Sequence, residues 1–379
     1  MKKKGLLLTI LVVMAFFYTY TSVYADTATY KTKYGTYSYM DDPNNSDGIK
    51  LTRYNEKRRR TAIYLPSEID GRKVTSIGAG IFGIEDEVDV YVKKLVIPET
   101  VIRLEDGCFT GVDTMTSVVI PDSVEYIGKR AFSDTILKSV KLPENLKVLR
   151  KYAFSGCSYL EKISLPDNLT TIESGAVSYC HNLKKLSIPA NVKKIEQGAF
   201  NGLTGLETIR VSSKNKKYDS RESCNAIIDT KENELIYACN NTVVPNSVKV
   251  IGSYAFSYCD KFETVELPEG VITIKSSAFE YNQKIKKLII PSTVSKIENY
   301  ILPFSNETEI VLKTTKLNSK TLGKRAFELS TMKNKANIKF CHIVIKVPQS
   351  KLSYYKKLIK KQSGANFFKG INPFEVVGM

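Results

Sequence analysis

The stretch LEKISLPDNLTTIESGAVSYC, residues Leu160–Cys180, decides the fold because its pattern returns along the chain at a nearly fixed interval. Its proline belongs to two series with a spacing of 22 or 23 residues: Pro98, Pro121, Pro143, Pro166 and Pro189, and then Pro245, Pro268 and Pro291. The 56 residues from Pro189 to Pro245 equal one 23-residue repeat and an insert of 33 residues. A period of about 20–50 residues is typical of repeat proteins that stack into a solenoid or similar array.

Apolar residues keep the same distance from each proline, and none of these columns contains a charged residue. In the stretch above they are Leu165 before the proline, and Leu169 and Ile172 after it. The column eleven residues after the proline is mostly aromatic: Phe109, Phe132, Phe154, Phe200, Phe256 and Phe279. One repeat cannot bury these side chains alone, whereas stacked repeats turn each column into a ladder inside the coil. The columns therefore predict an elongated, β-rich α/β solenoid.

The residues one and three positions before each proline are apolar, and this period of two predicts a short strand that ends at the proline. Proline has no N–H to donate, so it suits the end of a strand. We expect one such strand per repeat, stacked in parallel on one face. The apolar pair after the proline predicts a second short extended segment. Ala-Phe pairs such as Ala153-Phe154 predict a single helical or 3₁₀ turn.

The full frame, L-x-x-I-x-[IL]-P-x-x-[VL]-x-x-I-x-x-x-A-F-x-x-C, resembles the BspA type of leucine-rich repeat from about Tyr30 to the last residues. Gly35–Phe82 looks like that family's opening hairpin and first, longer repeat, and Tyr218–Thr242 looks like its hairpin insertion. The resemblance implies a right-handed leucine-rich repeat solenoid. It also implies a secreted or surface protein associated with adhesion to matrix proteins or other cells, without shared catalytic residues.

The first 25 residues are predicted to be a secretory signal peptide. Lys2–Lys4 form the positive segment, Leu6–Phe17 form the apolar segment, and Val23–Ala25 provide a small-residue cleavage site before Asp26. The apolar run is shorter than the roughly 20 residues that a spanning helix needs, although an uncleaved anchor is the alternative. No later apolar run is long enough to span a membrane. The sequence therefore predicts a secreted or cell-surface protein.

After the signal peptide, residues 26–348 are predicted to form the solenoid, with an N-terminal hairpin cap. A hairpin insert at about 211–241 should project from the solenoid or cover one edge of it. Residues 349–379 should form a C-terminal basic helix and cap.

The predicted C-terminal helix covers Leu352–Lys361 and places Leu352, Tyr355 and Leu358 on one face. The end of a repeat array needs a cap with a polar outer side, which this helix could provide. A basic amphipathic helix can also bind membranes. Its position at the end of the array favours the cap.

All seven cysteines follow residue 25. Cys157, Cys180 and Cys259 share one repeat column, and Cys108 replaces the alanine of an Ala-Phe pair. Cysteines fixed in a repeat are expected to be small buried hydrophobic residues.

Cys224 and Cys239 lie symmetrically about the predicted turn Thr230–Asn233. Opposite positions of a hairpin can hold a disulfide, and exported proteins meet oxidising conditions. The alternative is two buried thiols. Because seven is odd, at least one thiol stays free, and Cys341 is a candidate.

Residues with catalytic chemistry are sparse. The two histidines, His181 and His342, belong to no cluster with metal-ligand spacing, and no H-E-x-x-H, G-x-S-x-G or P-loop motif occurs. We therefore expect no enzymatic activity, no metal and no cofactor.

The chain has a formal net charge of +17, and removing Lys2–Lys4 with the signal peptide leaves +14. Such a charge favours acidic partners such as anionic polymers, acidic glycans or anionic cell surfaces. Export and the absence of a nucleic-acid-binding motif argue against nucleic acid. The alternative is a basic surface that only keeps the protein soluble.

Strand residues two and four positions before each proline should point away from the core. Five of them are lysines that would form a basic stripe: Lys94, Lys141, Lys162, Lys185 and Lys287. Regular stacking would bring the backbones of Lys162 and Lys185 to about 5 Å from each other. We interpret the stripe as a candidate binding face for a polyanion or an acidic protein patch. The alternative is that these lysines only protect a solvent-facing sheet.

Together these features predict a non-catalytic secreted or surface protein that binds an extracellular protein or an acidic glycan, as an adhesin does. The alternative is a structural component of the producing cell's envelope, retained on acidic wall polymers by its charge. Both hypotheses leave the oligomeric state open.

Overall fold

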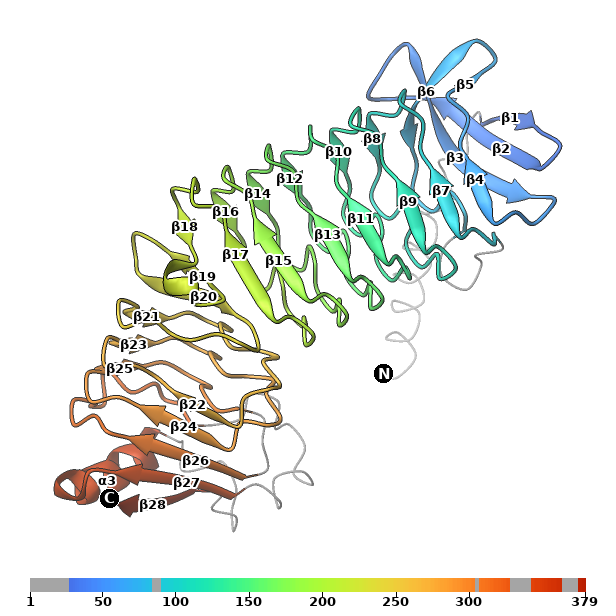
Figure 1. The fold of residues 1–379 in the computed structure, drawn as a ribbon. Coiled ribbons are helices and arrows are strands. Elements are labelled where there is room, and N and C mark those ends of the chain that lie inside the picture. The colour runs from blue at the N-terminus through green and yellow to red at the C-terminus, as the bar shows by residue number, and fades with distance from the viewer. Residues whose placement is uncertain (1–26, 84–89, 304–306, 328–341, 363–373) are drawn as a thin grey trace, which may run out of the picture.

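The computed structural model describes residues 27–83, 90–303, 307–327, 342–362 and 374–379, so the predicted signal peptide and Cys341 lie outside the described residues. The chain forms an elongated array of stacked coils that bends near its middle (Figure 1). Regular coils contribute two short strands, one before the proline and one after it. The strands of successive coils form two walls, which we call the front wall and the back wall.

The front wall contains the predicted strands that end at or near the prolines, together with three strands that no proline closely follows. They are β4 (Ala62–Tyr64), β7 (Lys94–Val96), β9 (Ser117–Val119), β11 (Ser139–Lys141), β13 (Lys162–Ser164), β15 (Lys185–Ile188), β17 (Thr208–Val211), β22 (Thr264–Glu266), β24 (Lys287–Ile290), β26 (Glu307–Leu312), β27 (His342–Val347) and β28 (Phe374–Gly378). Adjacent strands that pair in this wall are parallel, which confirms the predicted stacking.

The back wall contains the second extended segment of each coil, which the apolar pair after the proline predicted. Its strands are β6 (Arg72–Ile77), β8 (Arg103–Leu104), β10 (Tyr126–Ile127), β12 (Val148–Leu149), β14 (Thr171–Ile172), β16 (Lys194–Ile195), β21 (Val250–Ile251), β23 (Thr273–Ile274) and β25 (Lys296–Ile297). These strands also pair in parallel, so the array has strands on two faces rather than one.

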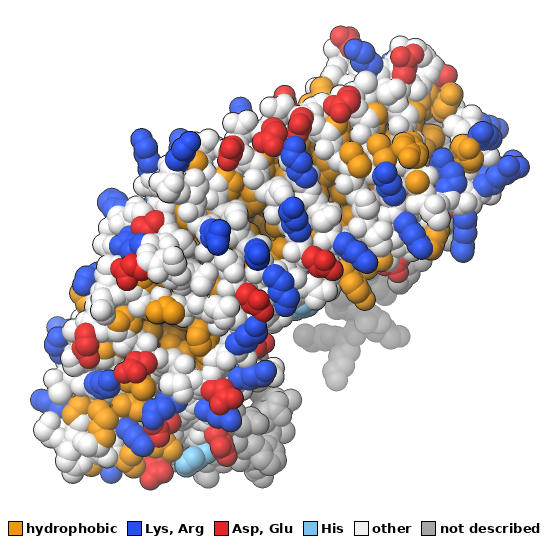
Figure 2. All heavy atoms as spheres, in the orientation of Figure 1, with side chains coloured by type: hydrophobic (Ala, Val, Ile, Leu, Met, Phe, Trp, Pro, Cys, Tyr) orange, Lys and Arg blue, Asp and Glu red, His pale blue; other side chains and the backbone are white. Residues whose placement is uncertain are grey.

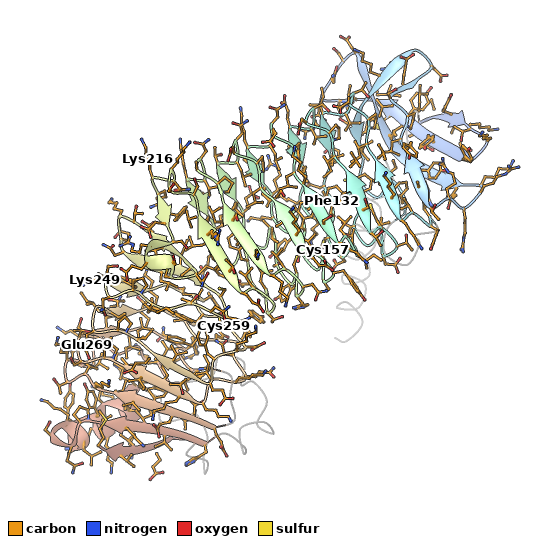
Figure 3. The ribbon with its side chains drawn as sticks, in the orientation of Figure 1. Phe132, Cys157, Lys216, Lys249, Cys259 and Glu269 are labelled. Atoms are coloured by element: carbon orange, nitrogen blue, oxygen red, sulfur yellow. The ribbon has the colours of Figure 1, made fainter. Side chains whose placement is uncertain are left out.

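The aromatic column forms a ladder between the two walls. The ring of Phe132 lies 5.2 Å from that of Phe109 and 5.1 Å from that of Phe154, measured between centroids, and Figure 3 marks Phe132 within the N-terminal half. Tyr54 packs against Phe82 at 6.1 Å and so extends the ladder into the N-terminal cap. Burial of these large rings gives each coil a core that it shares with its neighbours.

The Ala-Phe segments are turns, so the expectation of a helical or 3₁₀ turn is wrong there. In one of them Arg130 and Asp134 have positive φ angles of 56° and 59°. The N–H of Phe132 donates to Ala153 O in the next coil at 2.8 Å, whereas that of Ala131 donates within its own coil. Alternating backbone conformations therefore direct alternate N–H groups to the neighbouring coil, which a helical turn would not do.

The N-terminal cap is a small antiparallel sheet. It consists of β1 (Ala28–Lys31), β2 (Gly35–Asp41) and β3 (Gly48–Glu56), and β3 pairs in parallel with β6. The buried carboxylate of Asp42 accepts hydrogen bonds from Thr75 at 2.7 Å and from Ser76. These contacts join the cap to the first coil. A short β5 (Glu68–Ile69) pairs with β6 in the longer first repeat.

The insert continues the back wall, so the expectation that its hairpin projects or covers an edge is wrong. It contains β18 (Tyr218–Asp219), a 3₁₀ turn at Arg221–Ser223, β19 (Ala226–Asp229) and β20 (Glu234–Ala238). The strands β18, β19 and β20 are antiparallel, and β20 then pairs in parallel with β21. The hairpin divides the core: Ile227 belongs to the N-terminal hydrophobic cluster and Ile228 to the C-terminal one.

The front wall has no strand in the coil that follows the insert, although the sequence predicts one before Pro245. At the other end, β26 and β28 were not predicted because no proline follows them. The C-terminal region that was expected to form a helix and cap therefore also supplies β28, which pairs in parallel with β27.

The C-terminal helix α3 (Leu352–Gln362) follows a 3₁₀ turn at Gln349–Lys351. It buries Tyr355 and Leu358, and Leu352 packs at the margin of the same core. The Tyr355 hydroxyl donates to Thr314 O at 2.9 Å, and Gln362 donates to Ser319 O at 2.8 Å. The helix thus packs against the last coils, as a cap does.

The six described cysteines are buried free thiols, and Figure 3 marks Cys157 and Cys259 in the two halves of the array. Cys224 and Cys239 are not joined in this structure. Cys239 Sγ lies 3.3 Å from Asn225 O, whereas Cys224 Sγ lies 3.9 Å from Ala226 O. Burial raises the pKa of both thiols, which keeps them protonated and poorly reactive.

We expect Phe132→Ala to lower the free energy of unfolding by about 3–5 kcal/mol, because it opens a cavity between two stacked rings. Urea unfolding followed by circular dichroism measures this loss. Tyr159→Ala removes an aromatic ring that is 55% exposed and serves as the control, with a much smaller expected loss. Equal losses in the two variants would contradict the role of the ladder.

We also expect iodoacetamide to leave the six described cysteines of the native protein unmodified, because all six are buried. In denaturant without reductant, peptide mass spectrometry should find Cys224 and Cys239 separately alkylated. A linked pair of peptides containing these two residues would show instead that the protein forms the disulfide.

Candidate functional site

The front wall is interrupted twice, and a hollow lies at each interruption. In regular coils the residue before the proline donates its N–H to the next strand, as Leu142 does to Ser164 O at 3.1 Å. Within the described residues, Leu165 makes no such bond to β15, and Val244 makes none to β22. Accordingly β13 ends one sheet, β15 and β17 form a second, and β22 begins a third.

The first interruption opens a hollow of about 1200 Å³ between β13, β15 and β17. We call it the basic groove, because four basic and two acidic residues line it: Lys162, Lys184, Lys185 and Arg210, and Glu161 and Asp167. Figure 2 shows Lys and Arg side chains over this part of the front wall, with few acidic side chains among them. The groove therefore has a net positive charge.

Lys162 and Lys185 both line the basic groove, but their predicted adjacency on paired strands is wrong. Lys162 is in register with Ser139 of β11, and Lys185 with Thr208 of β17. Because β13 and β15 do not pair, the two lysines lie on separate sheets with the groove between them.

Arg210 is a groove residue that the sequence analysis missed. It is in register with Ser187 on the neighbouring strand and is exposed. No proline follows β17, so the search for residues before each proline passed over it. The buried Ile209 beside it continues the strand alternation and could have revealed it.

The remaining lysines of the predicted stripe lie outside the basic groove. Lys141 lies 3.4 Å from Glu144 and Lys287 lies 2.8 Å from Glu309. Hydrogen bonds from Lys287 and Lys346 lower the pKa of Glu309, so this carboxylate partly neutralises both lysines. Lys94 is exposed on β7, several coils from the groove. The stripe is therefore not continuous, and among the described residues its lysines without an ion-pair partner are Lys94 and the two groove residues, Lys162 and Lys185.

Ion pairing distinguishes the groove lysines from Lys141 and Lys287 of the stripe. Among the described residues, no carboxylate lies within ion-pair distance of Lys162, Lys185 or Arg210. Like charges that are close together and unpaired favour the binding of an anion.

The second interruption opens a hollow of about 480 Å³ beside β22. We call it the apolar groove, because its lining includes Val243, Val244, Phe262 and Leu267. Figure 2 shows hydrophobic side chains exposed between the two halves of the front wall. This groove lies where the coil after the insert lacks its front strand.

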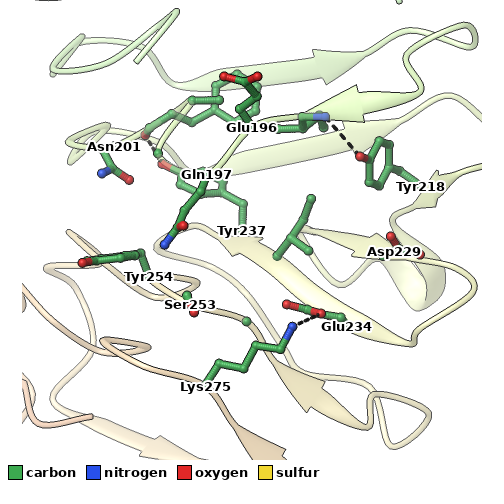
Figure 4. Close-up of a pocket in the computed structure, with 16 residues that line it drawn as sticks. Glu196, Gln197, Asn201, Tyr218, Asp229, Glu234, Tyr237, Ser253, Tyr254 and Lys275 are labelled. Carbon is green, nitrogen blue, oxygen red and sulfur yellow. Dashed lines mark hydrogen bonds and ion pairs between the residues drawn. The ribbon is translucent and has the colours of Figure 1, made fainter. Parts of the chain in front are cut away.

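A third hollow, of about 290 Å³, lies on the back wall where the insert separates β16 from β21 (Figure 4). Its polar groups contact one another: Lys275 Nζ lies 2.6 Å from Glu234, and the Tyr218 hydroxyl accepts from Ile195 N–H at 3.1 Å. Hydrogen bonds from Lys194 and the Ser174 N–H lower the pKa of Glu196. These partners hold the junction together.

In the described part of the chain, no group of three or more His, Cys, Asp and Glu residues is arranged to hold a metal ion. His181 shares a hydrogen bond of 3.1 Å with Thr204, and His342 lies 4.0 Å from Glu375. No described helix has the length and hydropathy to cross a membrane.

Two solved structures with the same fold come from bacterial proteins. The pneumococcal vaccine antigen PcpA has a TM-score of 0.67 and 19% identity, over 84% of this chain and 81% of that chain. A leucine-rich cell surface protein from Faecalibacterium prausnitzii has a TM-score of 0.55 and 20% identity, over 94% and 96%. At these identities the similarity shows the fold. Comparison with curated proteins gives no match.

The pattern described as a BspA type leucine rich repeat region matches residues 75–207 and 232–359, in six copies. These two ranges cover more than half of the chain and contain most of the coils of both walls. The chain therefore belongs to the BspA-type leucine-rich repeat family.

Proposed function

We propose that this protein is a non-catalytic, secreted or cell-surface binding protein whose basic groove engages an acidic extracellular protein or acidic glycan, as an adhesin does. One observation carries the proposal: Lys162, Lys185 and Arg210 line the same hollow without an ion-pair partner among the described residues. The family assignment and the cell surface protein among the structural neighbours support a location outside the cell.

The shape of the groove supports binding of a polymer rather than a small ion. It extends across β13, β15 and β17, and Ser164, Ser187 and Ser212 line it together with the basic residues. Serine hydroxyls can donate to carboxylate or sulfate oxygens, while the lysine and arginine side chains supply the attraction. Such a surface suits successive acidic groups along an extended ligand.

A second candidate function is retention on the producing cell's acidic wall polymers. It is favoured by the large net charge, which basic residues outside the groove also contribute. The two functions differ in their dependence on salt and on position. A groove ligand should depend on particular residues, whereas retention by net charge should depend on the number of charges and decrease steeply with salt.

The first test is an array of extracellular matrix proteins, acidic glycans and wall polymers, probed with the protein at low and at high salt. Binding to one target that survives high salt supports the groove proposal. Binding to every polyanion that disappears at high salt would contradict it and favour retention by charge.

We expect Lys162→Glu combined with Lys185→Glu to weaken binding of the selected target by at least about tenfold, or about 1.4 kcal/mol. Lys94→Glu is the matched control, because Lys94 is exposed, lies on the same wall and has no ion-pair partner among the described residues. Surface plasmon resonance measures both affinities. An equal loss per charge in the control would argue against a specific groove.

A further inference from the structure

The coil after the insert has no strand in the front wall, because its backbone is hydrogen-bonded to other parts of the chain. The N–H of Asn240 donates to Leu206 O at 3.1 Å, and the N–H of Val243 donates to Cys224 O at 3.0 Å. The segment therefore bonds to the preceding coil and to the insert instead of to β22. The front wall therefore has no strand paired with β22 on the side of β17, and we call this unpaired side of β22 the empty position.

The edge of β22 that faces this empty position has unused hydrogen-bonding groups. On its other edge, Lys287 N–H donates to Glu263 O at 3.1 Å and Leu267 N–H donates to Ile289 O at 3.0 Å. Since alternate residues of a parallel strand bond to opposite sides, the backbone groups of Thr264 and Glu266 face the empty position. No backbone hydrogen bond to these two residues occurs on that side among the described residues.

The apolar groove lies directly beside this edge and contains Thr264, Val265 and Glu266 in its lining. Val243 is 73% exposed there, and Phe262 is only partly buried. An open strand edge next to exposed apolar side chains is an unfavourable surface in a soluble protein unless it binds something.

We infer that the apolar groove is a docking site in which an extended segment of a partner protein adds to the front wall beside β22. Only an extended peptide backbone presents donors and acceptors that alternate at strand spacing to match Thr264 and Glu266. Its alternate side chains would enter the groove. Two carboxylates, Glu266 and Glu269, and one ammonium group, Lys313, line the groove. Lys313 pairs with Glu266 at 3.1 Å, so the Glu269 carboxylate gives the groove its net negative charge, which a segment with lysine or arginine fits.

This site is separate from the basic groove and does not depend on the function proposed for it. The basic groove lies at the interruption between β13 and β15 and attracts acidic groups. The β22 site lies at the interruption between β17 and β22, where it presents backbone hydrogen-bonding groups and apolar side chains.

The test uses the synthetic peptide LKKLSIPA, the sequence of Leu183–Ala190, because this segment fills the strand position in its own coil and carries two lysines. A scrambled peptide of the same composition is the control. Titration should give saturable binding of LKKLSIPA alone. Hydrogen exchange followed by mass spectrometry should slow in the peptide fragment that contains Thr264–Glu266.

Three variants assign the binding to the strand edge. Glu266→Pro removes the N–H that faces the partner segment, so it should weaken binding by about tenfold or more. The variant should still fold, because proline is tolerated on edge strands. Glu266→Gln keeps the N–H and removes only the side-chain charge, so it should weaken binding less than Glu266→Pro does. Val243→Asp places a charge on an exposed apolar residue of the groove and should also weaken binding. Thermal unfolding shows whether Glu266→Pro is folded, and Val243→Asp keeps the test valid if it is not.

Several results would overturn the inference. These are equal binding of the scrambled peptide, unchanged binding by both Val243→Asp and a folded Glu266→Pro variant, or protection from exchange at Lys162 and Lys185 instead. Sedimentation equilibrium adds another check: a dimer that Val243→Asp dissociates would make a second copy of the chain the occupant and overturn the assignment to a partner protein.

Discussion

Contact between the apolar columns of successive coils is the interaction on which the rest of the structure depends. No coil has a core of its own, and a ring such as Phe132 is buried only because Phe109 and Phe154 lie on either side. Each coil must therefore repeat the period of its neighbours, and both ends must be covered. The antiparallel sheet at the N-terminus and α3 at the C-terminus meet this requirement.

The insert relaxes this constraint at one place. Its hairpin enters the back wall and divides the hydrophobic core, with Ile227 on one side and Ile228 on the other. The front wall is not continued in the same way. The segment that would form its next strand is hydrogen-bonded to the insert instead, through Val243 N–H and Cys224 O. The insert thus continues the back wall and interrupts the front wall. The bend of the array lies in the same region (Figure 1).

The two grooves of the front wall have different chemistry because they arise in different ways. At the basic groove, both coils have their strands, but the strands are apart, so outward side chains such as Lys162 and Arg210 line the hollow. At the apolar groove a strand is missing, so backbone groups and core-type side chains such as Val244 are accessible. A repeat protein can in this way carry two distinct binding surfaces without a separate domain.

The sequence by itself determined the repeat, the aromatic ladder, the parallel strands before the prolines, the buried cysteines and the exposed lysines. All of these follow from local periodicity, because equivalent residues in identical coils have equivalent environments. Only the tertiary structure decided that β13 and β15 separate, that Arg210 joins Lys162 and Lys185, and that the insert displaces a front strand. These features depend on distances between coils. The residues of a single coil do not encode such distances, so a period read along the chain cannot reveal them.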